Sequence, residues 1–306
     1  MALHERNPNR LPANPVALLK AVNSAEKKSN ETFRLLLLVD VSLEPKLLAY
    51  AKEAFLPSTD NLSLCVMPYG NEPTVFAPGC DLVILLANQA PGTAYLLDKA
   101  HKQGLPAVAV TLDPARLLAI AQENNTPLDP ASLVAVSGKG SDPSRLQRLF
   151  EELGIWIIHH IETGTVALAR SLGFVRKPYV RNAIQVTSWE NAAISAVFFL
   201  PGSDMPLLTI NQVKLVLQIA SAYDVALDLK RIREIVPVLL GAIGLRGAAR
   251  KLVSFAPVLG WAIRGGVGYL GTLAIGTAAY AYFEAGAGSP EGFKVHHLVR
   301  RAKAVN

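Results

Sequence analysis

The chain contains few of the residues that build metal sites and disulfide scaffolds. Its 306 residues include two cysteines, Cys65 and Cys80, which follow neither metal-ligand nor C-x-x-C spacing. Its paired histidines are adjacent in sequence, so their side chains point to different helix faces rather than to one ion. We therefore expect no metal site and no disulfide, and two buried thiols in a reducing compartment.

Glycine is missing from the place where a nucleotide-binding loop needs it. The stretch LLLLVDVSLEPKLLAYAKEAF (35–55) predicts a buried strand, a tight turn and a helix, but the turn is VSLEP, with acidic Glu44 where a phosphate needs positive potential. The motifs G-x-x-x-x-G-K, D-x-x-G and N-K-x-D are absent from the whole chain. Without them nothing holds the β- and γ-phosphates or anchors magnesium. The sequence therefore predicts no GTP hydrolysis, no catalytic residue and no cofactor.

The first residues of the sequence do not predict a secretory signal. The N-terminal stretch MALHERNPNRLPANPVALLK begins with charge, asparagine and proline and has no apolar h-region. Because prolines interrupt residues 1–30, we expect a flexible leader there, followed by a cytoplasmic domain.

Residues 31–154 predict an α/β domain. Continuous apolar strands alternate with amphipathic helices, a pattern typical of a parallel sheet covered on both faces. Gly104 is expected to end the helix that precedes it. The predicted strands cover 33–40, 62–67, 80–87, 106–113 and 133–139, and the predicted helices cover 44–55, 91–104, 114–123 and 143–153.

The order CDLVILLA, KQGLPAVAVTLD and LVAVSGKGSDPSRLQRLFEEL resembles the second half of an Era-like small GTPase domain. In that family the base-reading strand ends in N-K-x-D. Here TLDP stands in its place, so Asp113 matches the aspartate while the asparagine and lysine are gone. Ser137-Gly138-Lys139 matches the S-A-K loop. The resemblance implies a degenerate GTPase-like domain in which Asp113, Ser137 and Lys139 are the candidate nucleotide-binding residues. The alternative interpretation is a doubly wound α/β domain that is unrelated to GTPases.

The basic residues concentrate in the second half of the chain. Residues 1–154 carry 14 Lys+Arg and 16 Asp+Glu, a net charge of −2, whereas residues 155–306 carry 16 and 8, a net charge of +8. A basic, glycine-rich and apolar segment suits an anionic lipid surface better than nucleic acid. We expect an all-α, glycine-rich, membrane-associated domain over 155–306 and no nucleic-acid partner.

Residues from about 178 to 283 resemble the YcjF-like, GTPase-associated domain of unknown function, which is found in bacteria and chloroplast lineages, often behind an Era-like GTPase domain. The resemblance rests on WENA, LPGSDMPLLTINQ, VKLVLQIASAYD and the later glycine-rich run. It implies membrane association and supplies no catalytic residues.

Three polar residues in this region are candidates for a structural or a signalling role. Asn191, Asp204 and Gln212 either form a polar cluster that receives a signal from the first domain or serve local structure. In the local interpretation, which we favour, Asp204 caps a turn and Gln212 completes a capping box with Thr209.

The segment GGVGYLGTLAIGTAAYAYF contains 19 uncharged residues, about the minimum for a bilayer-spanning helix. Gly268, Thr272 and Gly276 recur every four residues and predict one smooth face for close helix packing. Residues 252–283 are compatible with a single crossing, a membrane hairpin or a buried hairpin in a soluble bundle. The basic flank expected on the cytoplasmic side contains Arg246, Arg250 and Lys251.

The sequence therefore predicts a non-catalytic, pseudo-GTPase-like scaffold or regulator joined to a helical module. We expect it in the cytoplasm at the inner face of the membrane, with integral insertion left open. The expected partners are membrane lipid and either a GTPase of related fold or another copy of the chain. Two alternatives remain: a nucleotide-binding switch with an unconventional site around Asp40, Asp113 and Ser137-Lys139, and a soluble helical partner-binding protein.

Overall fold

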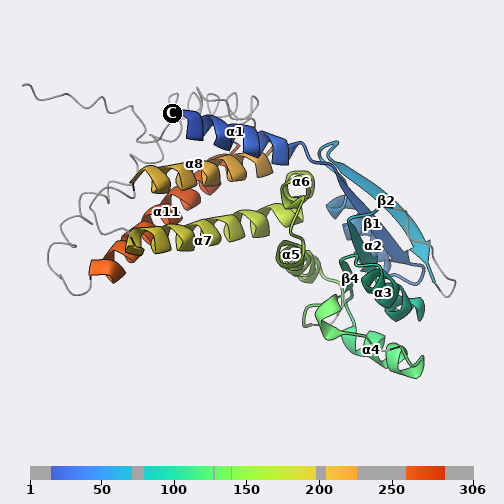
Figure 1. Ribbon diagram of the computed structural model, residues 1–306. Coiled ribbons are helices and arrows are strands. Elements are labelled where there is room, and N and C mark those ends of the chain that lie inside the picture. Colours follow the sequence, from blue (N-terminus) through green and yellow to red (C-terminus); the bar gives the residue numbers. More distant parts are fainter. Residues whose placement is uncertain are drawn as a thin grey trace, which may run out of the picture. The chain divides into compact units, whose positions relative to one another are not determined.

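The computed structural model describes residues 15–70, 79–126, 128–138, 140–197, 205–225 and 260–286. The chain divides into two compact units, the α/β unit (Asn30–Tyr179) and the helical unit (Met1–Ser29 with Val180–Asn306). The first contains a parallel sheet with helices, and the described part of the second is helical (Figure 1).

The elements follow the predicted alternation closely. Proline stands at the start of several helices, where its missing N–H costs nothing, and Gly104 with φ +70 ends α3 as expected. The strands are β1 (Phe33–Asp40), β2 (Leu62–Tyr69), β3 (Leu82–Leu86), β4 (Ala107–Val110) and β5 (Leu133–Val134). The helices are α1 (Pro15–Ser29), α2 (Pro45–Ala54), α3 (Gly92–Lys102), α4 (Pro114–Glu123), a 3-10 turn (Pro130–Ser132), α5 (Pro143–His160), α6 (Thr165–Ser171), α7 (Gly173–Val197), α8 (Met205–Ala222) and α11 (Gly260–Glu284).

The five strands form one sheet in the order β2-β1-β3-β4-β5, and every neighbouring pair is parallel. The chain passes from β1 outward to β2 and then crosses to β3 on the other side of β1. In doubly wound sheets the ligand crevice lies where this direction changes, outside the carboxyl ends of the strands, here β1 and β3. The predicted parallel sheet is confirmed, and its GTPase-like character stays a prediction.

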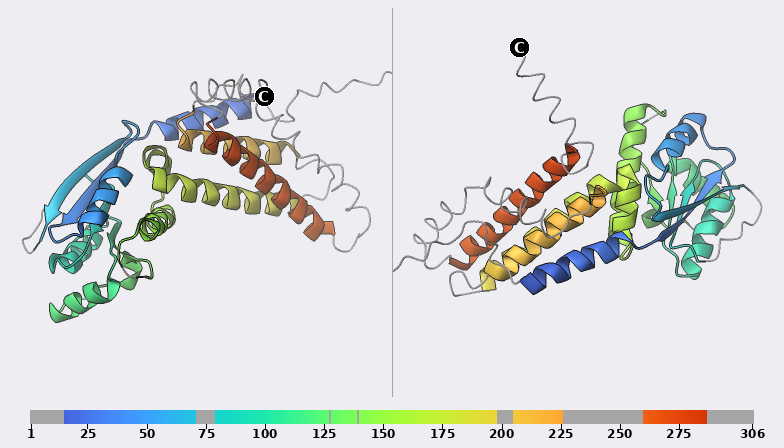
Figure 2. Two further views of the ribbon diagram at one scale, coloured as in Figure 1. Left: turned by 180° about the vertical axis from the view of Figure 1, so that it is seen from behind. Right: turned by 90° about the horizontal axis from the view of Figure 1, so that it is seen from above.

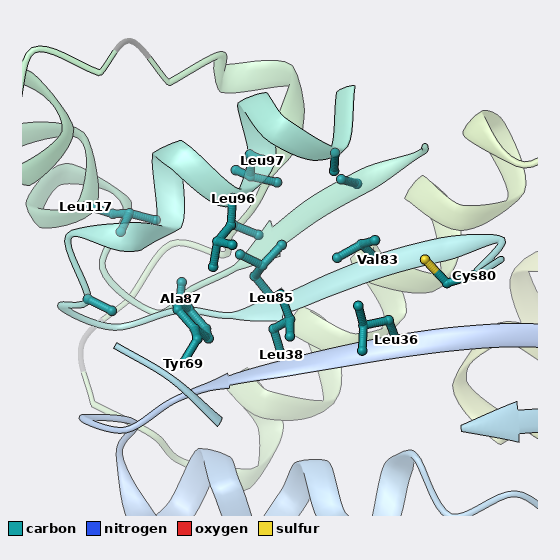
Figure 3. Close-up of a cluster of buried hydrophobic side chains, with 14 residues drawn as sticks. Leu36, Leu38, Tyr69, Cys80, Val83, Leu85, Ala87, Leu96, Leu97 and Leu117 are labelled. Atoms are coloured by element: carbon teal, nitrogen blue, oxygen red, sulfur yellow. The ribbon is translucent and has the colours of Figure 1, made fainter. Parts of the chain in front are cut away.

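Helices cover the central strands of the sheet, which explains their continuous apolar sequences. Side chains alternate between the two faces of each strand, so a strand covered on both sides is apolar throughout. The edge strand β2 is partly exposed, and the prediction of two buried thiols is wrong for Cys65 on this strand, which is exposed, while Cys80 is buried. One face holds a buried cluster built from β1, β3 and β4 with α3 and α4 (Figure 3). Its labelled members are Leu36, Leu38, Tyr69, Cys80, Val83, Leu85, Ala87, Leu96, Leu97 and Leu117.

The α/β unit is longer than the sequence predicted. The expected boundary at residue 154 falls inside α5, and the unit continues through α6 to Tyr179. The ring of Phe174 in α7 lies 5.3 Å from those of Phe55 and Phe150. The N–H and hydroxyl of Ser58 both donate to the Ser171 carbonyl at 3.1 Å. The boundary is therefore corrected to Tyr179, because α6 and the start of α7 complete the core of this unit.

In the helical unit, α8 packs between α1 and α11 (Figure 2). Helix α1 corrects the prediction of a flexible leader for Pro15–Ser29. Pro15 occupies the first helical position, which accepts proline, and Leu18 and Ala21 lie on a buried side of the helix. The leader's first residues, 1–14, lie outside the described residues. Among the described helices, none has both the length and the apolar character needed to cross a bilayer.

Candidate functional site

A buried carboxylate lies at the carboxyl end of β1, where the direction of the strand order changes. Asp40 is the last residue of β1 and is only 2% exposed. Its Oδ2 accepts hydrogen bonds from the backbone N–H groups of Asn88, Gln89 and Ala90, each at 2.8 Å. Its Oδ1 accepts from the N–H and the hydroxyl of Ser42, both at 2.7 Å. The backbone N–H groups of the loop after β3 are therefore bound to a carboxylate of the protein itself at this end of the sheet.

These hydrogen bonds keep Asp40 ionised. Burial by itself raises the pKa of the carboxyl, because it removes water from the charged form. The hydrogen bonds from Ser42, Ala90 and Asn88 outweigh burial and bring the pKa of Asp40 below its usual value. Three successive backbone N–H groups therefore form a concave nest, and Asp40 is the anion that it binds.

The turn after β1 closes around this carboxylate without any glycine. The side-chain amide of Asn88 donates to the Ser42 carbonyl at 2.6 Å and ties the loop after β3 to this turn. Glu44, at the end of the turn, accepts a hydrogen bond from the Ser141 hydroxyl. Glycine is needed where backbone must wrap a bound phosphate. Here the bound group is Asp40, which the chain itself holds in place.

The residues predicted as nucleotide-binding candidates do not take part in the hydrogen bonds of Asp40 in the described part of the chain. Asp113 caps α4, because its Oδ1 accepts a hydrogen bond from the Arg116 N–H at 3.0 Å. The Arg116 guanidinium reaches the side-chain carbonyl of Gln89 at 3.1 Å. Ser137 is exposed in the loop after β5, and Lys139 lies outside the described residues. Neither Asp113 nor Ser137 is among the hydrogen-bond donors to Asp40.

Arg145, in the first turn of α5, has no signature in the sequence. It is 4% exposed, and its guanidinium donates to the carbonyls of Leu112 at 2.6 Å, Val136 at 3.0 Å and Gly140. It therefore ties the loop after β4 to the loop after β5. No motif could identify this residue, because the carbonyls that it contacts come from loops that only the folded sheet brings together.

A separate hollow of about 580 Å³ lies in the α/β unit between the end of α2, α5 and the start of α7. Its lining includes Glu53 and Glu151 and, against them, Arg176 and Lys177. The Lys177 Nζ lies 3.5 Å from a Glu151 carboxylate oxygen. Because the charges of its walls balance, the hollow offers no excess charge to an ionic ligand.

A second polar site lies inside the helical unit. The buried hydroxyl of Thr272 accepts hydrogen bonds from the side-chain amides of Asn191 at 2.8 Å and Gln212 at 3.3 Å. It donates to the Gly268 carbonyl at 2.9 Å. The amide of Asn211 donates to Asn191 Oδ1 at 3.0 Å. The Thr272 hydroxyl thus uses its donor and both lone pairs, and one network joins α7, α8 and α11.

This network changes the interpretation of Gln212. The capping box predicted with Thr209 is wrong, because α8 begins at Met205 and Thr209 lies inside the helix. Asn191 and Gln212 belong instead to one cluster, which was the alternative interpretation. That this cluster receives a signal from the first domain stays a prediction.

The predicted smooth face of α11 is an interface between helices. A Cβ added to Gly268 meets the Ser195 hydroxyl, and it meets the Asn191 carbonyl oxygen at 2.6 Å. A Cβ on Gly276 lies 2.7 Å from the Ile184 side chain and 3.0 Å from that of Leu215. Only glycine permits such close approach, so α11 packs through Gly268 and Gly276 against α7 and α8.

Other predicted residues lie outside the described part of the chain. They are Asp204, Arg246, Arg250 and Lys251, together with the part of 252–283 that precedes Gly260.

Metal-binding groups and similar known proteins would each indicate a function for these sites. Within the described ranges, no group of three His, Cys, Asp or Glu side chains is placed to hold a metal ion. Comparisons with family models, curated proteins and solved structures found no match to this chain. The Era-like and YcjF-like resemblances stay predictions.

Proposed function

We propose that the protein is a non-catalytic scaffold or regulator, in which a degenerate GTPase-like domain is joined to a helical module that attaches to the inner face of the membrane. The observation that supports the non-catalytic part is the buried Asp40 carboxylate, which binds the backbone N–H groups of the loop after β3 at the carboxyl end of the sheet. A domain whose ligand position is filled by its own side chain keeps its surfaces for partners rather than for a substrate.

A nucleotide phosphate at this position has to expel a buried carboxylate that accepts five hydrogen bonds. Both groups are anions, so the nest cannot hold them together without strong repulsion. Glu44 adds negative charge to the same turn, and no phosphate-binding lysine motif compensates for it.

The membrane part of the proposal is supported by charge and composition. The second half of the chain carries the whole basic excess, with a net charge of +8 for residues 155–306. Such a segment is attracted to the anionic lipids of a cytoplasmic leaflet. The close-packed glycines and the buried threonine of α11 also match the small and polar interfaces that helices use in lipid.

The non-catalytic part is tested by titrating the intact chain with fluorescent GTP and ATP analogues, with and without magnesium. We expect no saturable binding at the nucleotide concentrations found in cells. Magnesium-dependent, saturable binding contradicts the scaffold proposal and favours the nucleotide-binding switch.

The membrane part is tested separately by fractionating cells that express the intact chain and washing the membranes with high salt and then with alkaline carbonate. We expect the chain in the membrane fraction. High salt releases it if charge alone holds it on the membrane, whereas it stays bound through the carbonate wash if apolar contacts hold it. A chain that is soluble from the start contradicts membrane attachment and favours a soluble partner-binding protein.

A further inference from the structure

The described helices of the helical unit have a mostly apolar interior that also contains polar side chains, and they carry large apolar side chains on their surface. Protein interiors are usually apolar, and a buried polar side chain is the informative exception. Here the interface of α7, α8 and α11 contains hydroxyl and amide side chains and glycines, while several large apolar side chains lie on the surface. The buried polar residues are Thr187, Ser188, Asn191, Ser195, Thr209, Gln212 and Thr272.

Large apolar side chains gather where α7 and α11 lie together. The side chains of Trp189 on α7 and Leu270 on α11 are 62% and 60% exposed. The rings of Trp189 and Tyr269 lie 4.8 Å apart between centroids, so the two helices share one surface. Val186 lies one helical turn before Trp189 on the same side of α7 and is also exposed. We name Val186, Trp189, Tyr269 and Leu270 the Trp189 face.

Helix α11 has no charged side to turn toward water. Between Gly265 and Phe283 it contains no charged residue. A helix that is apolar all round is found in a core or in lipid. Its inner side packs on α7 and α8 through Gly268 and Gly276, whereas Leu270 on its outer side is exposed. The outer side therefore needs an apolar environment that α7 and α8 do not supply.

Charge favours lipid as that environment. In sequence, the uncharged stretch 265–283 of α11 is flanked by basic segments: residues 226–264 carry seven Lys+Arg against two Asp+Glu, and residues 285–306 carry four against one. Basic segments beside an apolar surface attract anionic headgroups. Tryptophan and tyrosine also prefer the level of the headgroups, because their rings are apolar with one polar edge.

We propose that the Trp189 face is the surface by which the helical unit contacts an anionic membrane, with Trp189 and Tyr269 at the level of the headgroups. The inference rests on the proposed membrane attachment and specifies the surface that makes it. The helices lie in the interface with the Trp189 face toward the acyl chains, an arrangement that requires no membrane-crossing helix.

The test is flotation of the intact chain with vesicles made of equal parts phosphatidylglycerol and phosphatidylcholine, compared with phosphatidylcholine alone. We expect binding to the anionic vesicles. Leu270→Glu is expected to weaken this binding at least about tenfold, because it removes an apolar contact and adds repulsion. Leu19→Glu adds the same charge on α1, which α8 separates from α11, and is expected to bind within about threefold of the wild type because of screening.

A second measurement uses a chain in which Trp156→Phe and Trp261→Phe leave Trp189 as the single tryptophan. Quenching of its fluorescence by brominated lipid is expected. Circular dichroism confirms that each variant is folded, and Trp189→Ser replaces Leu270→Glu in the flotation test if the latter does not fold.

The outcomes separate the two proposals. If the wild type floats, both Glu variants float equally well and Trp189 is not quenched, this surface is wrong while membrane attachment stands. If the wild type does not float, the attachment and the surface fail together. If Leu270→Glu turns an oligomer into a monomer by light scattering and flotation is unchanged, the face joins copies of the chain and the lipid assignment is overturned.

Discussion

Asp40→Ala is the most direct perturbation of the loops after β1 and β3, because it removes five hydrogen bonds at once. The Ala90 N–H is buried, and the loss of its acceptor costs about 1 to 3 kcal/mol. The donors of Ser42, Asn88 and Gln89 lie closer to solvent, so water replaces part of what they lose. We expect the α/β unit to lose about 3 kcal/mol of unfolding free energy.

Urea unfolding measures this loss if one tryptophan reports on the α/β unit alone. Trp156 serves this purpose in a chain with Trp189→Phe and Trp261→Phe, because its Nε1 donates to the Ala131 carbonyl at 3.1 Å within this unit. Asp98→Ala, which breaks only an exposed pair with Lys102, is the control and is expected to cost less than about 0.5 kcal/mol. A loss below about 1 kcal/mol for Asp40→Ala refutes the assignment of the carboxylate as the group that holds these loops.

Inorganic phosphate gives the same variant a second readout. Without the Asp40 side chain, the N–H groups of Asn88, Gln89 and Ala90 lose their anion, and phosphate can take its place. Phosphate is expected to raise the urea midpoint of Asp40→Ala more than that of the wild type, because binding to the folded state alone stabilises it. Equal shifts in both proteins indicate a general salt effect and contradict an anion nest.

The remaining predictions concern close packing, the buried network and pH. Gly268→Ala is expected to destabilise the helical unit by about 2 kcal/mol, because the added methyl group overpacks the interface. Gly271→Ala is expected to be neutral or stabilising, because an added Cβ meets nothing within 4 Å there. Thermal unfolding of the two variants compares these effects. Thr272→Val removes the acceptor of two amide donors and is expected to lower the unfolding free energy of the helical unit by about 2 to 4 kcal/mol. Thr277→Val, at an exposed position, is the control and is expected to have little effect. Equal losses in the two variants contradict the network. The pKa of Asp40 is lowered in the folded state, so its contribution to stability is present above pH 3.8 and is lost as the pH falls further. The difference in unfolding free energy between the wild type and Asp40→Asn is therefore expected to shrink below pH 3.8, and a difference that is constant with pH contradicts the lowered pKa.

Much of the α/β unit could be predicted because its signals are local. The apolar run of β1 and the proline that opens α2 are visible within a few residues of sequence. The boundary at residue 154 could not be predicted, because α5 continues through it and the reason is a contact of Phe174 with Phe150 far along the chain. Helix α1 was not predicted, because prolines interrupt this part of the sequence; one of them, Pro15, occupies the first helical position, where a helix accepts proline.

The sequence by itself determined the alternation of strands and helices, the absence of phosphate-binding motifs and the small-residue face of α11, because each depends on the order and spacing of neighbouring residues. Only the tertiary structure decided what these features contact. It brought the loop after β3 to Asp40 and placed Asn191 and Gln212 on the hydroxyl of Thr272. Hydrogen bonds between groups 50 to 81 residues apart leave no periodicity in the chain, because they depend on the packing of whole elements rather than on local conformation.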